Sequence, residues 1–369
     1  MHARTSGRLA YGVTGISLVL VLTLAAMLFL GDLRIAVRDV VELDPPPSPE
    51  VFRLAGHIFT ITGAVVRAGE ADRATLWAWV PTPTVSVIEA AGPGTVTLRV
   101  ENLPTRVRLA ASGPVEQEQV GPIRTLRFAP IATRHLGFVA PTDTVTFTVL
   151  GDTGDSAIFA EALRAAASGQ ADFLLHVGDL IYDDTQMPNI EGILRQSPLP
   201  VFVARGNHDY RNGTRIAFMR ALGPPYYSFR IGSATFIILD NADDYLPRFW
   251  RRSTQYRWWT GMVGQAREGP LFVGMHKPPF DRRGDPRHYA PMLDHAFARQ
   301  LMRDFVQAGV GAVLTGHIHA SYLWVRDGIP YVVSGEGFES PGDPDGHRMA
   351  WVRVRGWDVA IEQIRIRKR

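Results

Sequence analysis

Hydrophobic and polar residues follow three different patterns along the chain. Residues 9–31 contain one long apolar run, and residues 51–142 contain short runs in which apolar and polar positions alternate. From residue 143 onward, apolar runs end in glycine-containing loops and are followed by stretches with helical spacing. Because period-two alternation is typical of strands and a period of 3.6 is typical of helices, the pattern predicts a hydrophobic leader, an all-β domain and an α/β domain.

The leader contains 22 consecutive uncharged residues, Leu9 to Leu30. At about 1.5 Å per residue this run can cross a hydrocarbon core of about 30 Å. It predicts a transmembrane anchor over residues 9–31, behind a short cytoplasmic tail of residues 1–8. A cleaved signal peptide is the alternative, although the run is longer than a usual signal core and no convincing Ala-x-Ala site follows it. Both interpretations place the remainder outside the cytoplasm, in the periplasm or the extracellular space.

A proline-rich linker, residues 32–50, joins this leader to the folded domains. Residues 51–142 then predict a small antiparallel β-sandwich that resembles immunoglobulin and fibronectin-III domains, because short alternating runs are separated by glycine, proline and asparagine. The expected strands are Ile58 to Val65, Ala74 to Val80, Thr95 to Val100, Arg106 to Ala110 and Arg124 to Phe128. This domain shows no cluster of catalytic residue types.

Residues 143–369 predict an α/β (α+β) fold, a mixed β-sheet sandwich flanked by helices. The expected helices are Ser156 to Ala167, Thr214 to Leu222, Thr254 to Ala266 and Pro291 to Ala308. A hairpin is expected around Gly232, and the residues from Trp351 onward alternate like two strands. His176 lies within an apolar strand and is expected to be a packed strand residue.

Five short polar blocks in this domain each follow an apolar, strand-like run. Because the carboxyl ends of parallel strands meet at one edge of a sheet, we expect the blocks to form one site. Each block alone is weak evidence, but five in one order are unusual. The blocks are Gly151-Asp152-Thr153-Gly154, Gly178-Asp179-Leu180-Ile181-Tyr182, Gly206-Asn207-His208-Asp209, Val273-Gly274-Met275-His276 and Gly316-His317-Ile318-His319.

These blocks supply oxygen and imidazole ligands in a number sufficient for two metal ions. Such ligands suit iron, manganese or zinc. Two ions about 3.5–4 Å apart, joined by a bridging carboxylate, activate a hydroxide and stabilise an in-line displacement at phosphorus. The pattern therefore favours phosphate ester hydrolysis. The candidate metal ligands are Asp152, Asp179, Tyr182, Asn207, His276, His317 and His319.

The ordered blocks resemble the calcineurin-like metallophosphoesterases, and more narrowly the purple acid phosphatases. The superfamily carries Asp-x-His in its first block, where this chain has Gly154, and the purple acid phosphatases compensate with a tyrosine in the position of Tyr182. The resemblance implies one metal held by Asp152, Asp179, Tyr182 and His319, and a second held by Asp179, Asn207, His276 and His317, with Asp179 bridging. It also implies that His208 is a catalytic acid outside the ligand set.

The phenol of Tyr182 has a pKa near 10 in water, so a strongly charged ion is needed to bind it as phenolate at neutral pH. We therefore expect Fe(III) at the Tyr182 site and Fe(II), Zn(II) or Mn(II) at the second site. His208 is expected to protonate the leaving alkoxide, and Asp209 to orient His208. The alternative for Asp209 is a loop-capping aspartate.

Composition removes several other possibilities. The chain has no cysteine, which excludes disulfides, thiolate metal sites and a disulfide-linked dimer. A net charge of +3 carried almost entirely by arginine gives no reason to expect a nucleic-acid partner. Basic residues in loops near the blocks are expected to be solvated or to steer an anionic group, and they are Arg211, Lys277, Arg282, Arg283 and His288.

Three functions remain open at this point. The first is an extracytoplasmic phosphomonoesterase, and the second is a phosphodiesterase acting on nucleotides or lipid head groups with the same metals. The third is a membrane-anchored envelope protein in which the sandwich binds a partner and turnover is small. The complete set of ligands favours an enzyme that acts on a phosphate ester, and the sequence leaves the oligomeric state open.

Overall fold

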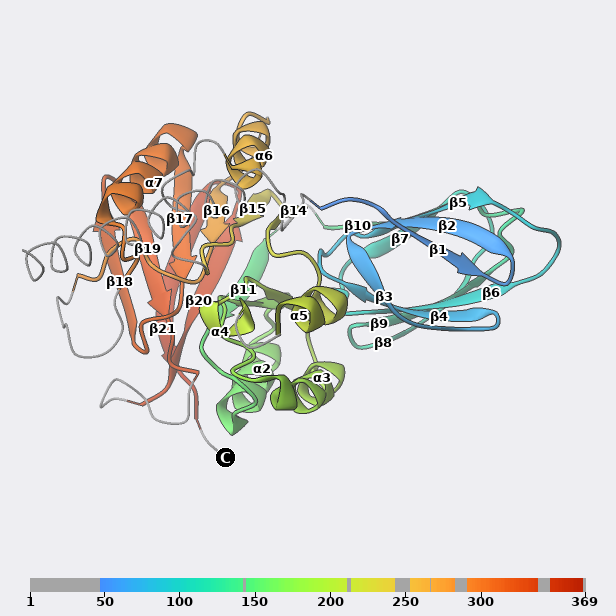
Figure 1. The fold of residues 1–369 in the computed structure, drawn as a ribbon, viewed down its shortest axis with the longest axis horizontal. Helices are drawn as coiled ribbons and strands as arrows, with labels where there is room; N and C mark the ends of the chain where they lie inside the picture. Colours follow the sequence, from blue (N-terminus) through green and yellow to red (C-terminus); the bar gives the residue numbers. More distant parts are fainter. Residues whose placement is uncertain are drawn as a thin grey trace, which may run out of the picture.

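A computed structural model of the chain describes residues 47–141, 144–210, 214–242, 253–265, 267–282, 291–337 and 346–367. The predicted tail, anchor and most of the linker lie outside these residues. Among the described residues, no helix is long and apolar enough to cross a membrane. The described chain forms a sandwich domain and a larger α/β domain beside it (Figure 1).

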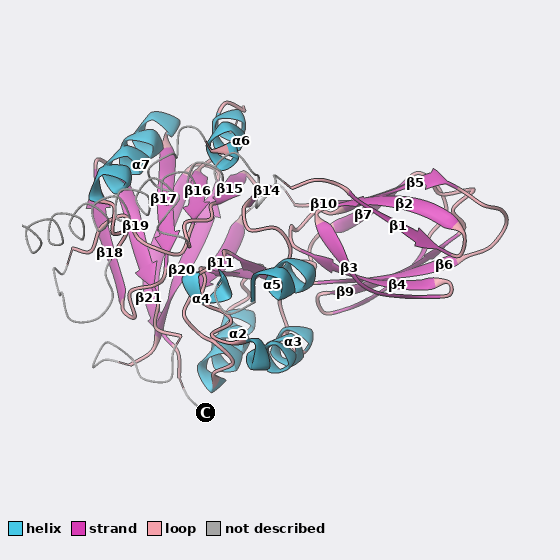
Figure 2. Cartoon of the chain, viewed as in Figure 1, coloured by secondary structure: helices cyan, strands magenta, loops and turns pink. Residues whose placement is uncertain are grey.

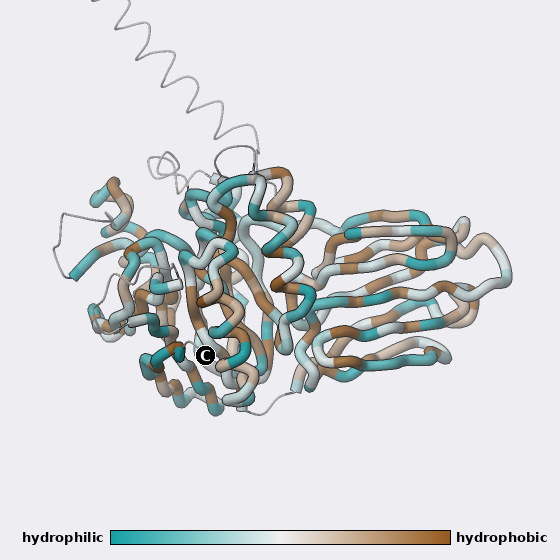
Figure 3. Tube along the Cα trace, turned by 90° about the horizontal axis from the view of Figure 1, so that it is seen from below, coloured by the Kyte–Doolittle hydropathy of each residue, from teal (hydrophilic) through white to brown (hydrophobic). Residues whose placement is uncertain are grey.

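The sandwich domain consists of two five-stranded sheets. The first has the order β1-β2-β5-β10-β7 and the second β3-β4-β6-β9-β8. The strands are β1 Glu50–Leu54, β2 His57–Thr62, β3 Ala64–Glu70, β4 Arg73–Ala78, β5 Thr84–Glu89, β6 Val96–Glu101, β7 Arg108–Ala111, β8 Glu116–Val120, β9 Ile123–Phe128 and β10 His135–Val139. In most of these strands apolar positions alternate with polar ones, as the tube coloured by hydropathy shows (Figure 3).

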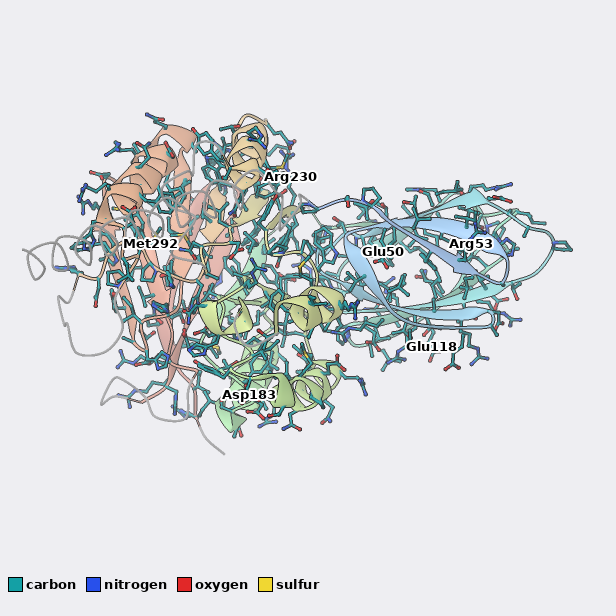
Figure 4. The ribbon with its side chains drawn as sticks, in the orientation of Figure 1. Glu50, Arg53, Glu118, Asp183, Arg230 and Met292 are labelled. Carbon is teal, nitrogen blue, oxygen red and sulfur yellow. The ribbon has the colours of Figure 1, made fainter. Side chains whose placement is uncertain are left out.

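The sequence prediction for this domain was wrong in one respect and incomplete in another. Strand β4 pairs with β6 in parallel, so the second sheet is mixed and not antiparallel, because the chain visits the other sheet through β5 between them. The expected strand Ile58 to Val65 is divided at Gly63, whose φ of +85° turns the chain from β2 into β3. Strand β8, which carries Glu118, is exposed at every position and gave no alternating signal (Figure 4).

The α/β domain contains two mixed sheets that pack face to face. Their orders are β13-β12-β11-β20-β21 and β14-β15-β16-β17-β19-β18. The strands are β11 Val145–Leu150, β12 Phe173–His176, β13 Val201–Val203, β14 Tyr227–Ile231, β15 Ala234–Ile238, β16 Leu271–Gly274, β17 Val310–Thr315, β18 Ser321–Arg326, β19 Ile329–Ser334, β20 Arg348–Arg355 and β21 Asp358–Arg365. Strands β11, β12 and β13 are parallel to one another, as are β15, β16 and β17.

A phenylalanine cluster fills the space between these two sheets. The rings of Phe147 and Phe173 stack at 5.1 Å, and Phe236 lies 5.0 Å from both Phe147 and Phe272. All four side chains are fully buried. Large aromatic side chains contribute much of the apolar area that holds such sheets together.

Helices cover the outer face of each sheet (Figure 2). They are α2 Ala157–Ser168, α3 Met187–Arg195, α4 Asn207–Tyr210, α5 Thr214–Leu222, α6 Thr254–Val263 and α7 His295–Ala308. Helices α2, α3 and α5 pack on the sheet of β11, and α6 and α7 pack on the sheet of β16. The predicted mixed sandwich flanked by helices is therefore confirmed, as is the hairpin around Gly232.

Three details of the helices differ from the sequence prediction. Helix α6 ends at Val263 and not at Ala266. Helix α7 begins at His295 and not at Pro291, because the Asp294 side chain accepts hydrogen bonds from the N–H groups of Ala296 and Phe297 and so caps the helix. Helix α3 was not predicted. The preceding short 3₁₀ turn, Asp184–Gln186, leads directly into it, and its two buried residues give a weak periodic signal.

Candidate metal centre

The candidate ligands lie together at one edge of the two sheets. Asp152 follows β11, Asp179 follows β12 and Asn207 follows β13, while His276 follows β16 and His317 follows β17. Since these strands run parallel within each sheet, their carboxyl ends meet, as the sequence predicted.

His276 lies at the centre of the ligand group and is fully buried. Its Nδ1 lies 2.9 Å from the carbonyl oxygen of Val177, so Nδ1 carries the hydrogen. The Nε2 atom then faces Asn207 Oδ1 at 3.1 Å, Asp179 Oδ2 at 3.3 Å and His317 Nδ1 at 3.2 Å. A fixed tautomer of this kind leaves Nε2 with a lone pair for a metal ion.

The group is a cation site by its chemistry. Ligand atoms of Asp179, His276 and His317 all lie within 4.8 Å of one another. Carboxylate, amide oxygen and imidazole lone pairs that converge in a buried space repel one another unless a proton or a metal ion lies between them. These donors are also the ones that iron, zinc and manganese accept. The residues present therefore fit a metal.

The titration behaviour of the group reflects the same crowding. Burial alone would lower the pKa of His276, but the carboxylates of Asp179 and Asp152 raise it to about 9. Burial acts to raise the pKa of Asp179, yet the His276 imidazolium and the N–H of His208 hold it below its usual value. Burial, together with the charge of His276, lowers the pKa of His317. The carboxylates of Asp179 and Asp152 therefore favour a positive charge at the position of His276.

Asp152 and His319 form the other part of the group. Asp152 is fully buried, and its Oδ2 accepts a hydrogen bond of 2.8 Å from the backbone N–H of His317. Its Oδ1 lies 3.6 Å from His319 Nε2. Burial raises the pKa of Asp152. Residues Asp152, Asp179 and His317 all have φ between +55° and +64°, a conformation that L-residues adopt at a cost and that clusters at functional sites.

Two glycines allow the backbone to approach the ligands closely. A Cβ on Gly206 would lie 2.2 Å from both the backbone nitrogen and Oδ1 of Asp179. A Cβ on Gly178, whose φ is +96°, would lie 2.5 Å from His276 Nδ1. No side chain fits at either position, which explains why glycine directly precedes Asp179 and Asn207.

Gly154 and Tyr182 are in contact, as their pairing in the sequence suggested. A Cβ on Gly154 would lie 3.1 Å from Cδ2 of Tyr182, and the φ of Gly154 is +50°. The ring of Tyr182 therefore occupies space beside the first ligand loop. Its centroid lies 4.5 Å from that of His208, and its N–H donates to Gln186 Oε1.

His208 and Asp209 have different surroundings. The N–H of His208 donates to Asp179 Oδ1 at 2.9 Å. This hydrogen bond orients the carboxylate that the family resemblance assigns to both metals. Asp209 is fully buried and accepts from three backbone N–H groups, those of Asp179 and Gly206 through Oδ2 and that of Ile181 through Oδ1. Burial and then the Asp179 charge raise the pKa of Asp209 to about 7. These contacts are those of a loop-capping aspartate, and an orienting role toward His208 stays a prediction.

A sixth strand end contributes residues that the sequence analysis missed. Asn241, after β15, accepts hydrogen bonds from the N–H groups of His276 and Lys277 through Oδ1, and its Nδ2 donates to the Lys277 carbonyl. Its neighbour Asp240 forms a buried ion pair with Arg205, one residue before Gly206. The signal was available, because Asp240 and Asn241 follow an apolar strand as the five blocks do.

The remaining sequence candidates are placed as follows. Lys277 is buried and not a solvated loop residue, whereas Arg282 is exposed. His176 is a packed strand residue, as expected, and its Nε2 lies 2.9 Å from Thr153 Oγ1. Arg211, Arg283 and His288 lie outside the described residues.

Comparison with known proteins is consistent with the site. The Danio rerio and Homo sapiens forms of serine/threonine-protein phosphatase CPPED1 are 26% and 27% identical to this chain over 201 and 203 residues. Each alignment covers 49% of this chain and 64% of the relative, so the chain spans somewhat less than two thirds of the length of these relatives.

Solved structures were compared as well. The purple acid phosphatase PPD1 from yellow lupin (Lupinus luteus) has a TM-score of 0.49 at 12% identity and covers 82% of this chain and 72% of its own. A dimetal phosphatase from Danio rerio has a TM-score of 0.44 at 14% identity and covers 61% of this chain and 100% of its own.

A match to a protein family includes all five polar blocks. Residues 145–321 match the model of the calcineurin-like phosphoesterases, and this range begins at the first residue of β11 and includes every candidate ligand from Asp152 to His319. The chain therefore contains a calcineurin-like metallophosphoesterase domain.

Proposed function

We propose that this protein is a metal-dependent phosphomonoesterase with two metal ions. The observation that carries the proposal is the arrangement around His276, where three ligand atoms lie within 3.3 Å of an Nε2 whose tautomer is fixed by Val177. A buried group of this composition at the carboxyl ends of five strands is suited to binding cations beside an anionic substrate. When bound, the metal pair supplies a hydroxide nucleophile and neutralises charge on the phosphate.

The division of ligands follows the geometry and the resemblance together. One ion would be held by Asp179, Asn207, His276 and His317. The three atoms that face His276 Nε2 belong to the other three residues of this set. Asp152, Asp179, Tyr182 and His319 would hold the other, with Asp179 shared. Fe(III) is the proposed ion at the Tyr182 site, because the phenolate needs a strongly charged partner, and Fe(II), Zn(II) or Mn(II) is proposed at the second.

The protein residues outside the ligand set have separate tasks. His208 follows Asn207 directly and is half-buried beside Tyr182, so it is the side chain proposed to give a proton to the leaving alcohol. Asp209 holds the loops of Asp179 and Gly206 in place through their N–H groups. The curated relatives are named serine/threonine-protein phosphatases, which supports a monoester of an alcohol as substrate.

The proposed location is outside the cytoplasm. It rests on the uncharged run from Leu9 to Leu30, which would anchor the protein in a membrane or be removed as a signal peptide. Protease protection of the intact protein in sealed membrane vesicles tests this proposal, and a folded domain that is accessible only from the cytoplasmic face would overturn it.

Activity on paired substrates tests the function. The full chain is loaded with Fe, Zn or Mn and assayed on p-nitrophenyl phosphate and on bis(p-nitrophenyl) phosphate, beside an Asp179→Asn variant. We expect metal-dependent turnover that favours the monoester and is lost in the variant. Preference for the diester would replace the monoesterase by a phosphodiesterase, and no metal-dependent turnover on either ester would reject both enzymes.

Colour tests the iron assignment independently. An Fe(III) ion bound to the Tyr182 phenolate should give a visible charge-transfer band that is absent in Tyr182→Phe. A colourless, fully active zinc or manganese protein would reject iron and leave the phosphatase proposal intact.

A further inference from the structure

The segment that carries Asn207 and His208 lies between two elements that contact the sandwich domain. Strand β13, Val201–Val203, is a three-residue edge strand that ends four residues before Asn207. Helix α5, Thr214–Leu222, follows the same segment and contacts β3 and β4 of the sandwich (Figure 1). The chain on both sides of this ligand segment therefore lies at the seam between the domains.

Asn102 binds the free edge of β13 from the sandwich side. Its side chain is buried, its Oδ1 accepts from the N–H of Val201 at 2.7 Å, and its Nδ2 donates to the carbonyl oxygen of Val201 at 2.8 Å. The same Nδ2 donates to the carbonyl oxygen of Ala78 in β4 at 2.7 Å. The Asn102 amide therefore pairs with the backbone N–H and C=O of Val201 as a neighbouring strand would, and it connects Val201 to the sandwich. The φ of Asn102 is +69°, a conformation that asparagine accepts more readily than most residues.

A second contact secures the other end of β13. The hydroxyl of Tyr227 donates to the carbonyl oxygen of Val203 at 3.1 Å, and both residues are buried. The ring of Tyr227 packs edge-on against Trp79, which leads out of β4, with centroids 5.4 Å apart. Sandwich residues thus hold the first residue of β13 directly and the last one through Tyr227.

Arg67 secures the element that follows the ligand segment. Its Nε and Nη2 both donate to the carbonyl oxygen of Ala221, near the carboxyl end of α5, at 3.0 and 2.6 Å. The guanidinium lies 3.8 Å over the ring of Trp77, and its Nη1 lies 3.8 Å from Glu101. Two sandwich residues, Trp77 and Glu101, therefore fix the position of the guanidinium, and the guanidinium fixes the end of α5.

We propose that the sandwich domain positions the ligand Asn207, with Asn102 and Arg67 as positioning residues that hold the elements before and after it. The inference rests on the proposed dimetal function and adds a task for the sandwich domain. Asn207 is assigned to the second metal alone, whereas Asp152, Tyr182 and His319 of the first metal lie on loops that neither β13 nor α5 carries. The first metal shares only Asp179 with this segment, through the N–H of His208, so loss of the sandwich contacts should weaken the second metal more than the first.

Metal binding by the full chain tests the proposal. Asn102→Gly keeps the φ of +69° and removes all three hydrogen bonds, and Tyr227→Phe removes one hydrogen bond without changing the backbone. The matched control is Arg106→Ala, because Arg106 of the sandwich also crosses the seam, donating to the Thr144 carbonyl at 3.0 Å and lying 3.3 Å from Asp172, and these two partners lie outside β13 and α5.

Calorimetric titration of each metal-free protein with Zn(II) gives the two site affinities. We expect Asn102→Gly to weaken the second site about tenfold, as is typical when a ligand loses the group that orients it. Tyr227→Phe should act in the same direction with a smaller change, and Arg106→Ala should stay within twofold of wild type at both sites. Equal weakening of both sites, or the same effect in the control, would show a general loss of stability and overturn the proposal.

Hydrogen exchange separates this proposal from the proposed function. In the metal-free protein, amides 201–222 should exchange faster in Asn102→Gly than in Arg106→Ala, and this readout needs neither metal nor activity. If wild type binds a single metal, the dimetal function fails while the exchange result still decides the positioning role. Unchanged exchange in this segment would reject it.

Discussion

His176 provides a test of how the interior beside the metal centre responds to acid. It lies on β12, three residues before Asp179, and is fully buried. Its ring packs edge-on against Phe159 at 5.4 Å, and its Nε2 lies 2.9 Å from Thr153 Oγ1. Burial, assisted by the charge of His276, lowers the pKa of His176 from 6.5 to about 3. The imidazole is therefore neutral in the folded protein over most of the acid range.

The lowered pKa makes the free energy of unfolding depend on pH. Between pH 6.5 and pH 3 the unfolded chain binds a proton at His176 that the folded chain does not. The contribution is therefore complete above pH 6.5 and is lost as the pH falls toward 3. One pKa unit corresponds to about 1.4 kcal/mol, so His176 alone should lower the free energy of unfolding by about 2 kcal/mol between pH 7 and pH 5.

His176→Phe isolates this contribution, since phenylalanine keeps a ring against Phe159 and cannot titrate. Urea unfolding of both proteins is measured at pH 7, 6 and 5 in the presence of a chelator, so that metal release does not contribute. We expect the wild-type free energy of unfolding to fall by about 2 kcal/mol more than that of the variant over this range. Equal falls in the two proteins would show that His176 is protonated in the folded state and would refute the reasoning.

Three further substitutions test the geometry of the centre and its support. Gly206→Ala places a methyl group 2.2 Å from Oδ1 of Asp179, so metal affinity should fall at least about tenfold in a chelator competition, and unchanged affinity would contradict the close approach. Phe236→Ala removes a fully buried ring from between the sheets and should lower the free energy of unfolding in urea by about 3–5 kcal/mol. Asp209→Asn places an amide where a carboxylate accepts hydrogen bonds from three backbone N–H groups, so the free energy of unfolding in urea should fall by about 1–3 kcal/mol. An unchanged free energy of unfolding would favour an orienting role for Asp209 over a capping one.

The location of the candidate metal centre could be predicted from the sequence because each candidate ligand is adjacent in the chain to the strand that it follows. An apolar run such as Val145–Leu150 identifies a buried strand, and the residue that follows it must lie at the strand end. Parallel pairing then brings separate strand ends together without any knowledge of the contacts between them. Gly178 and Gly206 are local in the same sense, because the close approach of the backbone at each position requires a residue without a side chain.

Contacts made by one side chain with distant backbone could not be predicted in this way. Asn102 lies in a turn of the sandwich, and nothing near it in sequence shows that its amide pairs with Val201, 99 residues away. Asn241 likewise supports His276 across 35 residues through backbone groups that every residue has. The parallel pairing of β4 with β6 is a matter of topology, and alternation within a strand is the same for either direction.

The contacts between the sandwich domain and β13 can be understood from the position of this strand in its sheet. The candidate ligand Asp179 follows a strand, β12, that is paired on both sides, whereas the candidate ligand Asn207 follows β13, an edge strand of three residues. An edge strand has unpaired N–H and C=O groups and can bend or pair elsewhere unless something binds them. Asn102 and Tyr227 bind those groups at Val201 and Val203. In this chain the sandwich domain therefore supports the edge strand that precedes Asn207.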